Sequence, residues 1–337
     1  MTHPAPLNVG DIAPLVHKLG RPPRVGLALG TGAARGWAHL GVLQALEEAK
    51  IPIHAIAGCS MGALVGGMYC ASGLGPLQHW AGKTRMRQLL TFIDPVFPRS
   101  GLIDGEKVLD FIHDLVADPP IESFPIRFAA VSTDLARSQA VFHLEGPLLE
   151  AIRASISLPG IFTPARDNGR LLVDGGLVDP LPTTILKEMG AEWIIAVDLT
   201  LNASIRLGKK RSHVPHKEPR LDPLPYVKGP LRRAWRRRVD GIRQWWEAEG
   251  AQPNMVEILL SSLYTMQSRL VEESLQETPA DVLLRPPLDD IRLLEFHRAW
   301  EAISVGHRVM QEAIAAWGGA QWFTPTPPTQ PRGAANP

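Results

Sequence analysis

A chain of 337 residues with 45% hydrophobic and 20% charged residues has the composition of an ordinary globular protein, which excludes disorder throughout. Its formal net charge of +1 gives none of the basic excess of a nucleic-acid-binding domain, and two cysteines, Cys59 and Cys70, form no framework of several disulfides. Residues 1–24 lack the apolar stretch of a secretory signal, and no apolar run approaches the roughly 18 residues that cross a bilayer, so we expect a cytoplasmic protein.

The first 200 residues alternate short apolar runs with helical patterns, which predicts a mostly parallel sheet covered by helices on both faces. Leu40, Leu43 and Leu46 have the spacing of a buried helix face. The predicted strands are 25–29, 53–57, 125–131, 171–173 and 193–198, and the predicted helices between them include 39–49 and 61–71.

The first predicted strand runs into a loop of small residues, Gly30-Thr31-Gly32-Ala33-Ala34-Arg35-Gly36. A dinucleotide fingerprint would need glycine at position 35 and an acidic residue after the second strand, and neither is present. The loop can instead direct the backbone N–H groups of Gly32 and Ala33 at a developing oxyanion, while Arg35 supplies positive charge or buttresses the loop. A glycine-rich connection that binds nothing is the structural alternative.

The second predicted strand ends in Gly58-Cys59-Ser60-Met61-Gly62, directly before the helical pattern of 61–71. A strand, a sharp turn and a helix are the context of a nucleophile elbow, in which the serine hydroxyl is exposed and glycines relieve crowding. The pentapeptide alone is common by chance, so its flanks carry the hypothesis that Ser60 is a nucleophile.

A nucleophilic serine needs a proton acceptor. The late histidines His213, His216, His297 and His307 do not follow predicted strands, so surface or packing roles suit them equally well. Asp174 follows the predicted strand 171–173 and precedes Gly175 and Gly176. In a parallel sheet the carboxyl ends of the strands form the ligand crevice, where this carboxylate can act as the base; an ordinary Asp-Gly turn is the alternative.

The composition changes after Leu201: thirteen Lys and Arg stand against three acidic residues between Arg206 and Arg243. Within it, an apolar stripe at helical spacing is formed by Leu231, Trp235, Val239, Ile242 and Trp246. Packing on the α/β body, docking on an anionic membrane surface and nucleic-acid binding are the three interpretations, of which the last has no recognition motif. The membrane-surface candidates are Arg232, Arg233, Trp235, Arg236, Arg237, Trp245 and Trp246.

These motifs, in this order, resemble the patatin-like phospholipase family, as does the segment from Ala154 to Pro164, Ala-Ser-Ile-Ser-Leu-Pro-Gly-Ile-Phe-Thr-Pro. The similarity runs from about Val25 to Asp198. It implies a three-layer α/β/α fold with a mostly parallel central sheet, and hydrolysis of phospholipid or lysophospholipid acyl esters without a metal or other cofactor. It also implies that Ser60 is the nucleophile and Asp174 the base. The glycines of the motifs are Gly30, Gly36, Gly58, Gly62, Gly175 and Gly176.

One departure concerns the oxyanion loop, where the family's usual third glycine is replaced by Ala33. If the family geometry places this residue at positive φ, alanine there costs about 1 kcal/mol. This departure and the basic insertion motivate an alternative function, a non-enzymatic adaptor that binds a lipid or a protein on the same fold. Membrane docking would place the protein at the inner face of the membrane.

The same observations divide the chain. We predict an N-terminal extension (1–23), a patatin-like catalytic α/β domain (24–200), a basic Pro-rich insertion with an amphipathic helix (201–250), C-terminal helices that pack on the catalytic domain (251–318) and a disordered tail (319–337). Helical patterning within the C-terminal part covers 254–276 and 288–317.

Overall fold

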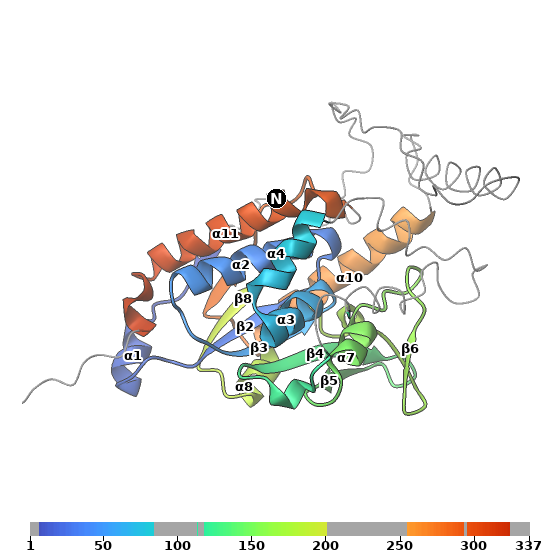
Figure 1. Ribbon diagram of the computed structural model, residues 1–337, viewed down its shortest axis with the longest axis horizontal. Coiled ribbons are helices and arrows are strands. Elements are labelled where there is room, and N and C mark those ends of the chain that lie inside the picture. Colours follow the sequence, from blue (N-terminus) through green and yellow to red (C-terminus); the bar gives the residue numbers. More distant parts are fainter. Residues whose placement is uncertain (1–6, 84–112, 114–117, 201–254, 293–294, 324–337) are drawn as a thin grey trace, which may run out of the picture. The chain divides into compact units, whose positions relative to one another are not determined.

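The computed structural model describes residues 7–83, 113, 118–200, 255–292 and 295–323 (Figure 1). The chain divides into a larger unit, Met1–Ala203 with Leu263–Pro337, and a smaller unit, Ser204–Ser262. The predicted basic insertion, its amphipathic stretch and all its membrane-surface candidates lie outside the described residues, as does the predicted tail beyond Phe323.

Nine strands form one sheet in the described part of the chain, in the order β1-β9-β8-β2-β3-β4-β7-β6, with β5 paired to β4. The pairings among β9, β8, β2, β3 and β4 are parallel, and those of β1, β5, β6 and β7 are antiparallel. The predicted mostly parallel central sheet is therefore confirmed, with antiparallel strands at both ends. The strands are β1 (Leu7–Val9), β2 (Val25–Leu29), β3 (Ile53–Cys59), β4 (Arg127–Asp134), β5 (Gln139–His143), β6 (Ala165–Asp167), β7 (Arg170–Asp174), β8 (Trp193–Val197) and β9 (Val282–Leu284).

Helices cover both faces of this sheet. The α-helices are α1 (Ala13–Leu19), α2 (Trp37–Glu48), α3 (Met61–Ser72), α4 (Leu74–Lys83), α7 (Leu148–Ser155), α8 (Thr183–Glu188), α10 (Met255–Glu277) and α11 (Ala299–Ala316). Short 3₁₀ turns are η1 (Ala33–Gly36), η2 (Ile121–Ser123), η3 (Gly175–Leu177), η4 (Phe296–Arg298) and η5 (Ala320–Phe323). None of the described helices has the length and apolar character needed to cross a bilayer.

The central strands bury alternate residues in two cores because successive side chains of a strand point to opposite faces. In β2, Leu27 and Leu29 contribute to the core under α2, α3, α7 and α11, whereas Ala28 contributes to the core with α8 and α10. Because both faces of the sheet are covered by apolar cores, the central strands have nearly continuous apolar sequences. The two cores and the sheet between them confirm the three-layer α/β/α architecture.

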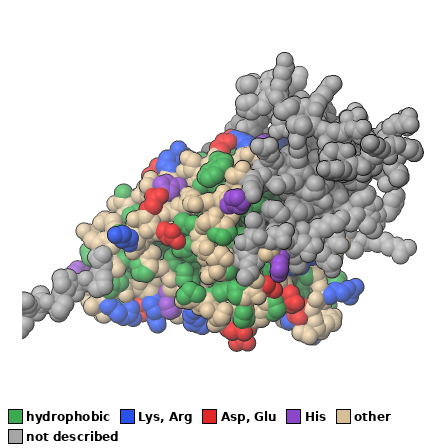
Figure 2. Space-filling view, viewed as in Figure 1, with side chains coloured by type: hydrophobic (Ala, Val, Ile, Leu, Met, Phe, Trp, Pro, Cys, Tyr) green, Lys and Arg blue, Asp and Glu red, His purple; other side chains and the backbone are tan. Residues whose placement is uncertain are grey.

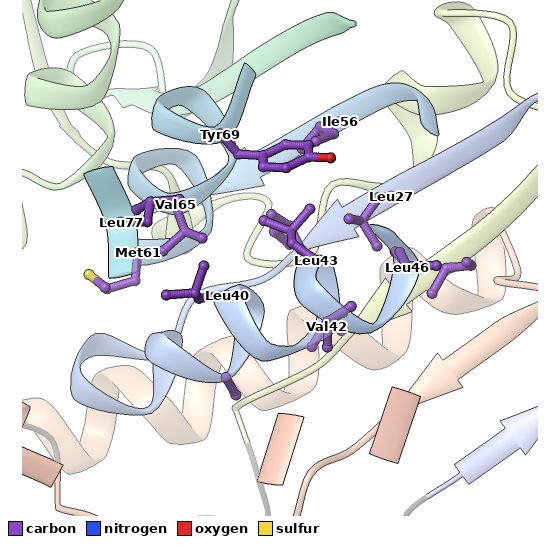
Figure 3. Packing of buried hydrophobic residues seen from close by; sticks show 14 of the residues in the cluster. Leu27, Leu40, Val42, Leu43, Leu46, Ile56, Met61, Val65, Tyr69 and Leu77 are labelled. Carbon is purple, nitrogen blue, oxygen red and sulfur yellow. The ribbon is translucent and has the colours of Figure 1, made fainter. Parts of the chain in front are cut away.

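The larger core is built on the helix face that the sequence predicts. Leu40, Leu43 and Leu46 of α2 are fully buried and lie in one cluster with Met61 and Val65 of α3 (Figure 3). On the outer side α2 packs along α11, and the two helices run side by side (Figure 1). On the described part of the face shown in Figure 2, acidic and basic side chains are interspersed, in keeping with the small net charge.

The C-terminal part differs from its sequence pattern at one point. The pattern predicts helical structure from Leu288, but η4 and α11 begin only at Phe296 and Ala299. Leu288 and Ile291 are buried in the core from an irregular segment, which the Arg298 guanidinium holds by binding the carbonyl of Asp290. Their apolar spacing thus reflects burial of a loop and not a helix face. At the far end, η5 places Phe323 against Trp317, with ring centroids 6.3 Å apart.

Candidate active site

Ser60 occupies the turn between β3 and α3. Its backbone has φ 56° and ψ −120°, in the left-handed region that a non-glycine residue rarely adopts. The flanking glycines are required by close packing: a Cβ on Gly62 would lie 2.0 Å from the carbonyl oxygen of Leu29, and one on Gly58 would lie 2.5 Å from that of Gly62. The strand, the strained turn and the helix therefore form the elbow that the sequence predicts at this position.

Asp174 is the last residue of β7, with 1% of its surface exposed. Its Oδ1 accepts a hydrogen bond from the N–H of Gly176 at 2.8 Å and a long contact from the Cys59 thiol at 3.9 Å. Its main-chain carbonyl accepts from the Thr133 hydroxyl at 2.9 Å. Gly175 packs against β4, because a Cβ there would lie 2.4 Å from the carbonyl oxygen of Val131.

The sheet brings Ser60 and Asp174 together end to end. β5 occupies one edge of β4 over Ala130–Asp134. β3 pairs with Arg127–Val131 and β7 with Ser132–Asp134, and each of these stretches overlaps the part covered by β5, so both strands use the other edge of β4. Cys59 lies opposite Val131 and Asp174 lies opposite the next residue, Ser132. The carboxyl ends of two strands that run in opposite directions therefore meet at adjacent positions of β4.

This arrangement corrects one step of the sequence analysis. Asp174 was expected at the carboxyl end of a strand in the parallel set, but β7 runs antiparallel to β4. Its carboxylate is near Ser60 because β7 approaches β3 head-on along the shared edge, and not because the two strands run side by side.

The carboxyl group of Asp174 is tuned by its surroundings. Burial raises its pKa to about 6, against the opposing effects of the Ser60 side chain, the Gly176 N–H and the Cys59 thiol. The second oxygen, Oδ2, is buried and meets no donor at ordinary hydrogen-bond geometry among the described residues. The Ser60 side chain is thus close enough to Asp174 to lower its pKa, and catalytic contacts of this kind often tighten only when substrate binds.

The glycine-rich loop after β2 lies beside these residues. The N–H of Gly30 donates to the carbonyl of Val197, and the N–H of Thr31 donates to that of Pro180. The Gly30 carbonyl accepts a hydrogen bond from His39 Nε2 at 2.8 Å. His39 is fully buried, and burial lowers its pKa to about 4, so the imidazole is neutral with its proton on Nε2. Sequence reasoning did not predict that His39 binds the glycine-rich loop, because a single histidine in a helical pattern gives no sign of such a contact.

Gly32 and Ala33, the predicted oxyanion donors, stand at the start of η1. Ala33 has φ 45°, so the condition for strain at the family's usual glycine position is met and alanine costs about 1 kcal/mol there. The Arg35 side chain donates from Nε to the carbonyl of Ile291 at 2.9 Å, which makes it a buttress of the loop. Gly36 ends η1 against α3, where a Cβ would lie 2.4 Å from that of Met61.

The part of α10 within the larger unit contributes two further residues that sequence reasoning missed. Gln267, 3% exposed, accepts a hydrogen bond from the Thr31 hydroxyl at 3.2 Å, and its Nε2 lies 2.3 Å from where a Cβ of Gly176 would be. It therefore links the glycine-rich loop to the turn after Asp174. Tyr264 is buried, and both burial and the charge of Asp174 raise its pKa, while Arg35 lowers it. The helical pattern of α10 predicts which of its residues are buried but not which parts of the chain they contact.

Known proteins are similar to this chain over most of its length. A family model, patatin-like phospholipase, matches residues 27–187. An uncharacterised NTE family protein of Mycobacterium tuberculosis is 36% identical over 332 residues, covering 88% of this chain and 92% of that protein. The lysophospholipase nte1 of Neurospora crassa is 31% identical over 86% of this chain, and that of Yarrowia lipolytica is 32% identical over 84%. This chain spans only 18% and 19% of the length of these two fungal proteins. By these matches the chain belongs to the patatin-like phospholipase family, among its NTE family proteins.

Proposed function

We propose that this lipid ester hydrolase acts on lysophospholipids, with Ser60 as the nucleophile and Asp174 as its base. The observation that carries the proposal is the meeting of β3 and β7 on adjacent positions of β4, with the serine on a strained turn and the carboxyl group buried. The relatives named lysophospholipases support the substrate class. Action in the cytoplasm and contact of the basic insertion with a membrane surface stay predictions.

Acylation begins when the ionised Asp174 takes the proton of the Ser60 hydroxyl as its oxygen attacks the ester carbonyl carbon. The carbonyl oxygen becomes negatively charged, and the N–H groups of Gly32 and Ala33 stabilise it, together with the N-terminal end of α3. As the carbon–oxygen bond to the leaving alcohol breaks, Asp174 returns the proton to that alcohol. The products of this half-reaction are an acyl-serine and the glycerophosphodiester that carries the released alcohol.

Deacylation repeats the same steps with water. Asp174 takes a proton from a water molecule, whose oxygen attacks the acyl carbon, and the proton then passes to the Ser60 oxygen as the acyl bond breaks. The raised pKa of Asp174, about 6, suits both directions of transfer, because the group is ionised at neutral pH and still basic enough to accept a proton. The products are a fatty acid and the free enzyme.

The substrate class is tested by the release of fatty acid from purified full-length protein. A panel of a 1-acyl lysophospholipid, a diacyl phospholipid, a triacylglycerol and a short p-nitrophenyl ester separates the candidates. We expect the largest kcat/KM for the lysophospholipid. A larger value for another ester would overturn the lysophospholipid assignment, and no release from any of them would overturn hydrolysis altogether.

The rate of ester hydrolysis should depend on the protonation of Asp174. Only the ionised carboxylate accepts the serine proton, so kcat/KM should fall about tenfold per pH unit below pH 6. Asp179 also has a pKa raised to about 6 by burial, and it therefore provides the matched control. A pH profile of Asp179→Asn should keep the acidic limb of the wild type. If the limb disappears in Asp179→Asn, it belongs to that residue and the assignment of Asp174 as base is contradicted.

A further inference from the structure

The end of α7 and the residues just after it contact the backbones of both proposed catalytic residues. Ser155, the last residue of α7, and Ser157 are both fully buried. The Ser155 Oγ accepts a hydrogen bond from the N–H of Ser60 at 2.9 Å. Two residues further on, the carbonyl of Ser157 accepts one from the N–H of Asp174 at 3.0 Å. One short turn thus binds the backbone of both residues at the point where β3 and β7 meet.

Buried hydrogen bonds hold this turn itself. The Ser157 hydroxyl donates to the carbonyl of Arg153 at 2.6 Å and accepts from the Arg153 guanidinium at 2.5 Å. The same guanidinium donates to the carbonyl and the hydroxyl of Thr163 at 2.9 and 2.8 Å. Arg153 is 8% exposed, so these bonds form in a region with little water, where a satisfied polar network is rigid. The two points that bind Ser60 and Asp174 are therefore fixed relative to each other.

The bond to Ser60 matters because that residue is strained. A φ of 56° costs of the order of 1–3 kcal/mol and persists only where the surroundings determine it. The N–H of Ser60 belongs to the peptide plane that precedes the φ torsion of this residue. A hydrogen bond at that N–H restrains the plane, and with it the direction in which the Ser60 side chain projects. In a serine–aspartate pair no histidine stands between the hydroxyl and the carboxylate. The separation of hydroxyl and carboxylate then depends on how the two backbones are held.

We propose that Ser155 is a positioning residue that sets the separation between the Ser60 hydroxyl and the Asp174 carboxylate without touching the substrate. This inference rests on the proposed function, because it assigns Ser155 a part in the same reaction. It also gives a role to the Ala154–Pro164 segment, whose pattern resembles the family but suggests no chemistry by itself.

The inference is tested with Ser155→Ala, which removes the acceptor and keeps the rest of the side chain. We expect kcat for a lysophospholipid to fall about 10–100-fold with KM within about twofold, because misplacement of a reacting group by about 1 Å has effects of this size. The acidic limb of the pH profile should move to higher pH, since the Ser60 side chain holds the pKa of Asp174 down. Ser155→Thr, which keeps a hydroxyl acceptor, should recover most of the lost kcat.

The matched control is Thr183→Val, which removes another buried hydroxyl, one that donates to the carbonyl of Thr278 at 3.1 Å. It should lower thermal stability and leave kcat and the pH profile unchanged. Wild-type kcat and pH profile in Ser155→Ala would overturn the inference, as would a loss of kcat with an unmoved acidic limb. If Ser155→Ala does not fold, Ser155→Cys, with a weaker acceptor of similar volume, should show a smaller loss with the same shift of the limb. An inactive wild type would instead refute the proposed function itself.

Discussion

Replacing Ser60 by alanine is expected to lower kcat for ester hydrolysis by at least about a thousandfold, because no acyl-serine can form. The fold should remain intact, since alanine bears the left-handed backbone of this turn no worse than serine does. Release of fatty acid from a lysophospholipid measures the loss, and thermal unfolding measures the stability.

Ser138→Ala provides the matched control for this substitution. Ser138 also has a positive φ, 54°, but it is exposed in the turn between β4 and β5. It should retain wild-type kcat. Residual turnover in Ser60→Ala within about tenfold of the wild type would show that another group is the nucleophile.

Replacing Asp174 by asparagine is expected to abolish turnover and, at the same time, to stabilise the protein at alkaline pH. The amide cannot accept the serine proton, so kcat should fall at least about a thousandfold. Asparagine can still accept the hydrogen bond that the Gly176 N–H now donates to Oδ1. The variant should therefore keep the local structure of η3.

The stability gain follows from the raised pKa. Burial shifts the pKa of Asp174 from 3.8 to about 6, so the native state binds this proton more tightly than the unfolded chain does. The stability that the proton contributes is complete below pH 4 and is lost as the pH rises through 6. Above pH 6 the buried charge costs about 3 kcal/mol as an upper value, which asparagine avoids.

Urea unfolding at two pH values measures this effect. The free energy of unfolding of Asp174→Asn should exceed that of the wild type by about 1–3 kcal/mol at pH 8, and most of the difference should disappear at pH 4. A variant less stable than the wild type at pH 8 would show that the carboxylate is well solvated or paired, and so contradict a base whose pKa is raised by burial.

The parts of the fold that sequence predicts are those whose signal is local. β2 and β3 were predicted within two residues of their observed ends because central strands buried on both faces are continuously apolar. β1, β5, β6 and β9 were not predicted. They have three, five, three and three residues, and the strands that pair with them, rather than a pattern of their own, determine them.

The candidate site likewise has one part that the sequence predicts and another part that it does not. Ser60 and Asp174 lie in short motifs that can be recognised one at a time, and the strained φ at Ser60 and at Ala33 agrees with what those motifs imply. The bond between Ser60 and Ser155 spans 95 positions, and that between Thr31 and Gln267 spans 236. Such contacts depend on the packing of α7 and α10, which no single-chain pattern specifies. The antiparallel approach of β7 was missed for the same reason.

Labelling with a fluorophosphonate probe, followed by peptide mass mapping, tests the proposed serine–aspartate pair most directly. In the wild type we expect a single adduct on Ser60, formed at least about a hundredfold faster than in Asp174→Asn. Equal labelling rates in the two proteins, or an adduct on a different residue, would contradict activation of Ser60 by Asp174.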